Sequence, residues 1–189
     1  MDAVGLVLAA GAGRRYGGAK ALAADPDGTG WLLRTVAALR DGGCSAVTVV
    51  LGAEAEAARD LLEGSGTAIV VASDWAEGLS ASLRAGLGGL AGLPATIDRA
   101  VLTLVDLPDV GAPVVARVLA GAAGPEALAR AVYAGRPGHP VVLGRAHWAA
   151  ASTAATGDRG AGAYLAAHGA ELVECADLAT GRDVDTSVR

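Results

Sequence analysis

Short apolar runs alternate along the chain with segments in which apolar residues recur every three or four positions. Such runs are typical of buried strands, and the wider spacing is typical of helices that bury one face. The pattern predicts strands at 3–10, 46–52 and 67–73, within 99–110, twice within 126–144, and at 170–176. It predicts helices at 31–43, 54–64, 79–90, 111–121 and 160–169. The first half of 126–144 also fits a helix.

The predicted strands are almost continuously apolar and alternate with helices. Strands of this kind are buried on both faces, which predicts a mainly parallel sheet between two layers of helices. We therefore expect an α/β fold with three α/β/α layers, formed by a single domain over residues 1–189. Ligands of such sheets bind beyond the carboxyl ends of the strands, which points to the segments 9–20, 73–80 and 106–110.

The composition argues against several classes of protein. Hydrophobic residues make up 52% of the 189 positions, but no stretch approaches the roughly 20 apolar residues of a membrane span. The apolar start, 4–10, has no basic segment before it, and we interpret it as a strand rather than a signal peptide. Cys44 and Cys175 have neither a disulfide nor a metal-binding spacing, so we expect a cytoplasmic protein. A net charge of −5 argues against a general nucleic-acid binder, and we expect no nucleic-acid or membrane partner.

The segment LAAGAGRRYGGAK, at 8–20, follows the first predicted strand and ends on Lys20, the only lysine in the chain. A glycine-rich loop after a strand exposes backbone N–H groups that can bind phosphate. Arg14, Arg15 and Lys20 add positive charge that can hold a triphosphate of about four negative charges and stabilise a leaving pyrophosphate. The loop therefore predicts a nucleotide-binding site, against the simpler interpretation of a tight turn.

Two established phosphate-binding motifs do not fit this loop. A dinucleotide fingerprint needs G-x-G-x-x-G and an acidic residue after the second strand, but Gly17 comes one position late and Gly52 replaces the acid. A Walker A motif needs lysine directly after its last glycine, but Ala19 separates Gly18 from Lys20. The remaining interpretation is a nucleotidyltransferase loop.

Polar residues outside the loop are further candidates, each with a structural alternative. Asp106 ends the fourth predicted strand, where its carboxylate could bind Mg²⁺ or simply form a turn. Asp183 and Asp185 would face the same side of an extended segment, or belong to a solvated tail. Ser80 and Ser82 could do no more than cap a helix.

LAAGAGRRYGGAK resembles the L-A-A-G-x-S/G-x-R-x-G-x-x-K signature of the MobA-like nucleotidyltransferases, and it is most similar to the molybdenum-cofactor cytidylyltransferase branch. Further segments resemble the family in the same order along the chain. These are EGLSASLRAGL (77–87), DLPDV (106–110), GRPGHPVVL (135–143), GDRGA (157–161) and DVDT (183–186). Together they span nearly the whole chain, so the ordered set is more specific than the first motif alone.

The resemblance implies a Rossmann-like nucleotidyltransferase fold of the GT-A type, with a mainly parallel mixed sheet. It assigns catalysis to Arg14, Lys20 and Asp106, and Mg²⁺ binding to Asp106 and Asp185. It places His139 beside the acceptor, although a lone histidine among turn residues is more often structural. The residues that it implies bind the nucleotide are Leu8, Ala9, Ala10, Gly11, Gly13, Arg14, Arg15, Lys20, Gly78, Ser80 and Ser82.

The reaction that the resemblance implies is transfer of CMP from CTP to molybdopterin, with Mg²⁺ as cofactor and pyrophosphate as the leaving group. The terminal phosphate of the acceptor is already an anion at neutral pH, so no protein base is needed. Cytosine is expected because Ala10 stands where guanylyl-transferring relatives have glycine, and because GLSASL resembles the cytidylyl branch. A molybdoenzyme or a chaperone would be a further protein partner.

Other functions within the same family stay open. Relatives of this shape transfer guanylyl groups, or activate sugar phosphates, phospholactate-type acids and methylerythritol phosphate. Some similar chains are described as nicotine-blue-type oxidoreductases, which need NAD(P)H. The lack of an acidic residue after the second predicted strand argues against that cofactor. A non-enzymatic nucleotide-binding subunit would lack the metal-binding carboxylates, and both are present.

Overall fold

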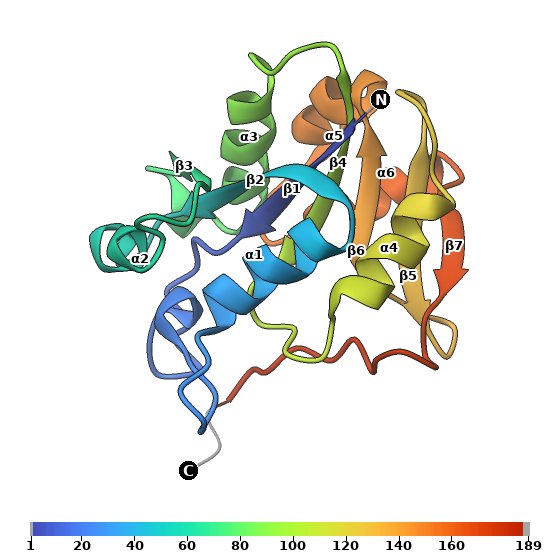
Figure 1. The fold of residues 1–189 in the computed structure, drawn as a ribbon. Coiled ribbons are helices and arrows are strands. Elements are labelled where there is room, and N and C mark those ends of the chain that lie inside the picture. Colours follow the sequence, from blue (N-terminus) through green and yellow to red (C-terminus); the bar gives the residue numbers. More distant parts are fainter. Residues whose placement is uncertain (1, 187–189) are drawn as a thin grey trace.

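The computed structural model describes residues 2–186, and a seven-stranded sheet forms its centre (Figure 1). The strands lie in the order β3-β2-β1-β4-β6-β5-β7. Their bounds are β1 Asp2–Leu8, β2 Cys44–Leu51, β3 Ala68–Val71, β4 Ile97–Leu104, β5 Leu128–Tyr133, β6 Arg136–Gly144 and β7 Glu171–Glu174. β6 runs antiparallel to both of its neighbours, and the other pairs are parallel. The mainly parallel mixed sheet is therefore confirmed.

Helices cover both faces of the sheet, which confirms the three-layer architecture (Figure 1). On one face lie α1 (Trp31–Asp41), α2 (Ala55–Leu61) and α4 (Ala112–Ala120), and on the other α3 (Leu79–Leu90), α5 (Trp148–Ala154) and α6 (Gly162–Ala167). Each face has its own cluster of buried apolar residues. Within residues 2–186, no helix combines the length and the apolar character that crossing a membrane requires.

Helix α1 shows how local pattern and packing agree. Its apolar face, from Trp31 to Leu39, is buried at the spacing that the sequence pattern predicts. Leu39 packs directly over Gly5 of β1, where a side chain would come within 2.8 Å of the leucine. Gly42 follows the last residue of the helix and lies so close to Val115 of α4 that no side chain fits between them. Small residues at these positions therefore let the helix lie close to both the sheet and its neighbour.

Two segments fold in ways that the pattern left open or missed. Residues 126–144 contain a β-hairpin, because β5 and β6 are joined by Ala134 and Gly135, with φ angles of 51° and 77°. The helical alternative for the first half of this segment is therefore wrong. Helix α5 is absent from the predicted elements, because in its sequence WAAASTA only Trp148 and Ala151 mark the buried face.

One edge of the sheet collects the chain segments that carry the candidate site. The parallel strands β1 to β5 end at this edge, and the antiparallel β6 begins there. After β7, the C-terminal segment turns and runs along the same edge toward the loop after β1, as the red trace in Figure 1 shows. Residues from opposite ends of the sequence therefore meet at the carboxyl edge.

Candidate active site

A cavity of about 670 Å³ lies at the carboxyl edge, within the size range of small-molecule sites. Its walls come from the loop after β1, the segment before α3, the end of β4 and the C-terminal segment. The predicted residues that line it are Leu8, Ala10, Gly11, Gly13, Arg14, Arg15, Lys20, Gly78, Ser82, Asp106 and Asp185. The structure thus brings most of the predicted nucleotide- and metal-binding residues together.

The glycine-rich loop closes into a tight turn at one end of this cavity. The N–H groups of Gly17 and Gly18 donate to the carbonyl oxygen of Gly13, at 2.9 and 3.3 Å. Gly13 has a φ angle of +56°, and a side chain at this position would collide with the carbonyl oxygen of Gly18. The turn therefore requires glycine at 13. It carries Arg14 and Arg15 directly to the cavity wall.

Lys20 lies between the two carboxylates that were predicted to bind metal. Its Nζ is 2.6 Å from Asp106 Oδ2 and 3.4 Å from Asp185 Oδ1. Arg15 contacts the other oxygen of Asp185, at 3.3 Å. Burial alone would lower the pKa of Lys20, but hydrogen bonds to both carboxylates and their negative charge outweigh it, so this pKa is raised. Lys20 is therefore a fixed cation at this end of the cavity.

Backbone contacts attach the C-terminal segment to the end of β4. The N–H of Val184 donates to the carbonyl oxygen of Asp106, at 3.0 Å. Earlier in this segment, the N–H and the hydroxyl of Thr180 both donate to Asp109 Oδ2, at 2.6 Å each. Because Val184 is hydrogen-bonded to Asp106, the next residue, Asp185, lies close enough to reach Lys20.

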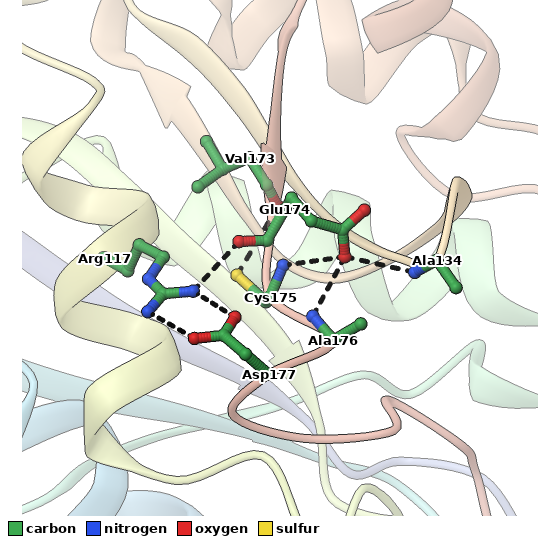
Figure 2. Close-up of polar contacts among 7 residues, drawn as sticks. All are labelled: Arg117, Ala134, Val173, Glu174, Cys175, Ala176 and Asp177. Carbon is green, nitrogen blue, oxygen red and sulfur yellow. Dashed lines mark hydrogen bonds and ion pairs between the residues drawn. The ribbon is translucent and has the colours of Figure 1, made fainter.

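A second group of contacts holds the start of this segment, as Figure 2 shows. Arg117 of α4 donates to both carboxylate oxygens of Asp177, at 2.5 and 2.9 Å, and to the carbonyl oxygen of Glu174, at 3.1 Å. The carboxylate of Glu174 accepts backbone N–H groups from Ala134, Cys175 and Ala176. These hydrogen bonds lower the pKa of Glu174 and keep it ionised. Helix α4 and the β5–β6 turn thus fix the path that leads to Asp185.

Six lining residues were not among the predicted site residues, and the three with polar or aromatic side chains are Trp75, Asp158 and Asp183. Trp75 precedes the EGLS segment and forms part of the cavity wall. Asp158 lies in the GDRGA segment, and its Oδ1 would be only 2.5 Å from a side chain at Gly78. The sequence signal for Asp158 was its place in a segment that resembles the family, and Trp75 lies just before another such segment.

The structure places Ser80 behind the cavity wall rather than on it. Its side chain is buried, and its hydroxyl accepts a hydrogen bond from Arg84 at 3.2 Å. Its N–H donates to the carbonyl oxygen of Gly157, at 2.9 Å. Direct nucleotide contact by Ser80 does not fit this position, because the hydroxyl faces the protein. Ser82, two residues later, does line the cavity.

Two other predicted residues line smaller cavities next to the main one. Ala9 belongs to a cavity of about 200 Å³, which shares Leu8 and Lys20 with the main cavity. His139 lines a cavity of about 150 Å³ together with Leu8 and Arg130. The predicted acceptor residue is therefore separated from the phosphate-binding loop, but adjoins the same walls.

The chain matches the family model of the MobA-like NTP transferase domain over residues 5–172. The protein belongs to this family. Nicotine blue oxidoreductase from Paenarthrobacter nicotinovorans is 36% identical over 195 residues, which cover 96% of this chain and 91% of that protein. The family relationship confirms the resemblance seen in the sequence, and this MobA-like chain is a nucleotidyltransferase that uses a nucleoside triphosphate and an acceptor.

Solved structures of other proteins share the MobA-like fold. Rv0371c from Mycobacterium tuberculosis H37Rv has a TM-score of 0.77 and 27% identity, over 98% of this chain and 94% of that chain. Its complex with manganese has a TM-score of 0.70 and 26% identity, over 93% and 88%. A nucleotidyl transferase from Methanothermobacter thermautotroptrophicus has a TM-score of 0.77 over 92% and 87%, and its 22% identity shows likeness of fold alone.

The carboxylates of the MobA-like site suit a divalent cation. Asp106 Oδ1 is buried and has no hydrogen-bond partner among the described residues. Mg²⁺ is commonly held by one or two carboxylates, while substrate phosphates and water complete its coordination. Across residues 2–186, no group of three or more His, Cys, Asp or Glu side chains forms a metal site. Asp106 and Asp185 are the residues of this cavity that could supply carboxylate ligands to such an ion.

Proposed function

We propose that the protein transfers CMP from CTP to a phosphorylated acceptor, with Mg²⁺ as cofactor, and releases pyrophosphate. The observation that carries this proposal is the arrangement of opposite charges along one cavity. Arg14, Arg15 and Lys20 supply cations to a loop of glycines, and Asp106 and Asp185 adjoin the same lysine. The cavity can therefore bind a triphosphate and a metal ion side by side.

In the proposed reaction, the glycine-rich loop and its cations bind the β- and γ-phosphates and stabilise the charge that develops on pyrophosphate. Asp106 and Asp185 would hold Mg²⁺, which supplies charge neutralisation at the phosphates when it is bound. An oxygen of the acceptor phosphate forms the new bond to the α-phosphorus, and the bond between this phosphorus and the pyrophosphate oxygen breaks. Because that acceptor oxygen is already ionised, the protein contributes position and charge rather than a base.

The proposal of cytosine rests on three further residues of the cavity wall. Ala10 and Ser82 both line the cavity, together with Trp75. The methyl group of Ala10 takes up space that a purine could use, and the hydroxyl of Ser82 can pair with the polar edge of a pyrimidine. Ser80 contributes by holding the start of α3 through Gly157 rather than by touching the base.

For the acceptor we propose molybdopterin, on the sequence resemblance to the molybdenum-cofactor branch. A molybdoenzyme, or the chaperone that delivers the finished cofactor to it, would then receive the product. We place this activity in the cytoplasm, where CTP and Mg²⁺ are both available.

A nicotine-blue-type oxidoreductase is the second candidate function, because the curated relative of that name is 36% identical along almost the whole chain. Such an activity needs a site for a nicotinamide dinucleotide. After β2, however, the position of the ribose-binding acid is taken by Gly52, and Trp75 packs against this glycine so closely that a side chain would lie 2.6 Å from the ring. This packing favours the nucleotidyltransferase.

One experiment separates the candidates. The protein is incubated with each nucleoside triphosphate and Mg²⁺, with and without molybdopterin, and pyrophosphate release is measured together with the mass of the product. A parallel incubation with NADH or NADPH and nicotine blue follows nicotinamide oxidation. Pyrophosphate release that depends on CTP and molybdopterin supports the proposal. Nicotinamide oxidation without pyrophosphate release would instead establish the oxidoreductase.

A further inference from the structure

Residues 14–18 form the tip of the glycine-rich loop, and four of these five residues are exposed. Two of the exposed residues are glycines, and the other two, Arg14 and Arg15, belong to the wall of the main cavity. Arg15 pairs with Asp185, but the exposed fractions of the two side chains are 81% and 45%, and ion pairs in such positions contribute little to stability. The tip therefore needs another attachment if the two arginines are to keep a fixed position.

Tyr16 supplies this attachment. It is the only partly buried residue of the tip, and it packs against the apolar cluster that α1 covers. The centroid of its ring lies 5.3 Å from the centroid of the Trp31 ring, and the two ring planes form an angle of 51°. A tilted pair at this distance is an attractive arrangement of aromatic rings. The tip of the loop is thus attached to the first residue of α1.

Trp31 is a firm support, because several contacts determine its own position. Its exposed fraction is 4%, and its indole N–H donates to Asp25 Oδ1 at 2.7 Å. Its backbone N–H donates to the carbonyl oxygen of Ala23, at 2.9 Å. Arg34, one turn further along α1, pairs with the other carboxylate oxygen of Asp25 and holds this carboxylate in place. Trp31 lies outside the wall of the main cavity, so it can affect a bound nucleotide only through its neighbours.

The segment DPDGTG, at 25–30, brings Asp25 to this support. The N–H of Asp25 donates to the carbonyl oxygen of Thr29, at 3.0 Å, and the N–H of Gly28 donates to that of Asp25, at 2.9 Å. Gly28 has a φ angle of +88°, which glycine adopts without steric cost. The segment therefore closes into a turn directly before α1 and returns the Asp25 carboxylate to the indole of Trp31.

We propose that Tyr16 is a positioning residue for Arg14 and Arg15, and that Trp31 and Asp25 act through it. The contact between the two rings holds the tip of the loop, so both arginines line the cavity before a triphosphate arrives. Binding then does not have to order the loop, and less of the interaction energy is lost. This inference rests on the proposed function, in which the two arginines bind the β- and γ-phosphates.

Tyr16→Ala distinguishes positioning from a general defect through the length of the phosphate chain. Calorimetry measures the affinities for CTP, CMP and inorganic triphosphate, each with Mg²⁺. We expect Tyr16→Ala to bind CTP and inorganic triphosphate roughly tenfold more weakly, because the arginines lose their fixed position. The affinity for CMP, which lacks the β- and γ-phosphates, should stay within about twofold of the wild-type value. Equal losses for CMP and CTP, or an unchanged affinity for inorganic triphosphate, would overturn the proposal.

Tyr16→Phe keeps the ring and should restore the wild-type affinity for inorganic triphosphate. Leu33→Ala is the matched control, because Leu33 lies on α1 close to Trp31 but is 43% exposed, and it should leave this affinity unchanged. If Tyr16→Ala does not fold, Tyr16→Leu takes its place. It keeps apolar bulk without the aromatic contact and should still bind inorganic triphosphate several-fold more weakly. Failure of Tyr16→Phe to restore binding would contradict the role of the ring.

The indole N–H of Trp31 provides a second measurement, since the chain has only three tryptophans and their indole signals can be followed separately by NMR. Trp31→Phe identifies the signal. Inorganic triphosphate should shift the Trp31 signal in the wild type and in Tyr16→Phe, because the ring contact transmits the change in the loop. It should leave the signal unshifted in Tyr16→Ala. Equal shifts in all three proteins would show that Tyr16 does not connect Trp31 to the phosphate site.

The pyrophosphate assay separates this inference from the proposed function. Tyr16→Ala should raise the KM for CTP with little change in kcat, because a saturating triphosphate orders the loop itself. If pyrophosphate is released but Tyr16→Ala leaves KM unchanged, the positioning role fails while the proposed function stands. If no nucleoside triphosphate is turned over but Tyr16→Ala weakens the binding of inorganic triphosphate, the proposed function fails and the positioning role is retained.

Discussion

Lys20 Nζ lies 2.6 Å from Asp106 Oδ2, so the only lysine of the chain pairs with a carboxylate that is proposed to bind the metal ion. The exposed fractions of these two side chains are only 16% and 13%. Lys20 also reaches Asp185, which leaves one ammonium group between the two proposed metal ligands. In the protein alone, the lysine therefore lies between the two carboxylates that are proposed to hold a divalent cation.

This pairing predicts that Lys20 and the metal ion compete until a nucleotide is bound. In Lys20→Gln, Mn²⁺ should bind the nucleotide-free protein several-fold more tightly, because Asp106 and Asp185 lose their cation. Pyrophosphate release should fall on the order of a hundredfold, because the leaving group loses its charged partner. Mn²⁺ binding is measured by electron paramagnetic resonance, with Arg59→Gln on the surface of α2 as the control. Weaker Mn²⁺ binding in Lys20→Gln would show that the lysine does not compete.

Asp106→Asn and Asp185→Asn should each lower the turnover rate on the order of a hundredfold and raise the Mg²⁺ concentration needed for activity. The amide is a poorer ligand for a hard cation, and Asp106 is also the partner of Lys20. Mg²⁺ titrations of pyrophosphate release measure both effects. Asp183→Asn is the comparison, since Asp183 lines the cavity without an ion pair to Lys20 among the described residues. Greater damage from Asp183→Asn than from Asp185→Asn would reverse the assignment within the pair.

Arg117 should act at a distance, as a positioning residue for Asp185. Arg117→Met removes the ion pair to Asp177 and the hydrogen bond to the carbonyl oxygen of Glu174, so the C-terminal segment loses its attachment to α4. We expect the Mg²⁺ concentration at half-maximal activity to rise roughly tenfold, while the affinity for CTP changes little. Faster hydrogen exchange over 176–186 should accompany this change. Arg117→Lys, which keeps the charge, should recover part of the Mg²⁺ affinity, and normal Mg²⁺ dependence in Arg117→Met would contradict the positioning role.

Ala10→Gly should move the nucleotide preference toward GTP. Removing the methyl group from the cavity wall gives a purine more room, and a difference of one methyl group is commonly worth about tenfold in specificity. The ratio of kcat/KM values for CTP and GTP measures the change. Ala12→Gly, in the same loop and lining the same cavity, is the control and should leave the ratio unchanged. A wild-type protein that prefers GTP would defeat the cytidylyl proposal and leave the nucleotidyltransferase class intact.

His139 should make the folded protein less stable in mild acid. Its pKa is about 4 in the folded protein, against an ordinary value of 6.5. Between these values the unfolded chain binds a proton at His139 and the folded chain does not, so protonation favours unfolding. The contribution of His139 to the free energy of unfolding is therefore fully present above pH 6.5. It is lost as the pH falls toward 4, and the loss is at most about 3 kcal/mol. Urea unfolding measured across this pH range should show that the free energy of unfolding declines less steeply in His139→Gln than in the wild type. Identical declines in the two proteins would refute the expectation.

The local pattern of the chain determined the strands and most helices. Apolar runs and three-to-four spacing are properties of neighbouring residues, so β1 to β4, α1 and α3 could be predicted without knowing what they contact. The glycine-rich loop could be predicted for the same reason, because its glycines, arginines and lysine lie within one short segment. The family signature placed Asp106, Asp185 and His139 near the site, although their partners were unknown.

Only the tertiary structure decided how these side chains meet. Lys20 and its two carboxylates are separated by 86 and 165 positions in the chain, and no local pattern encodes a pairing across such distances. The same holds for Arg117, which holds the C-terminal segment from α4. Ser80 illustrates the opposite case, since its sequence position predicted ligand contact but the packing of α3 turned its hydroxyl toward Arg84. Charge, burial and pairing depend on what surrounds a side chain, and those surroundings exist only after the sheet has brought distant segments to one edge.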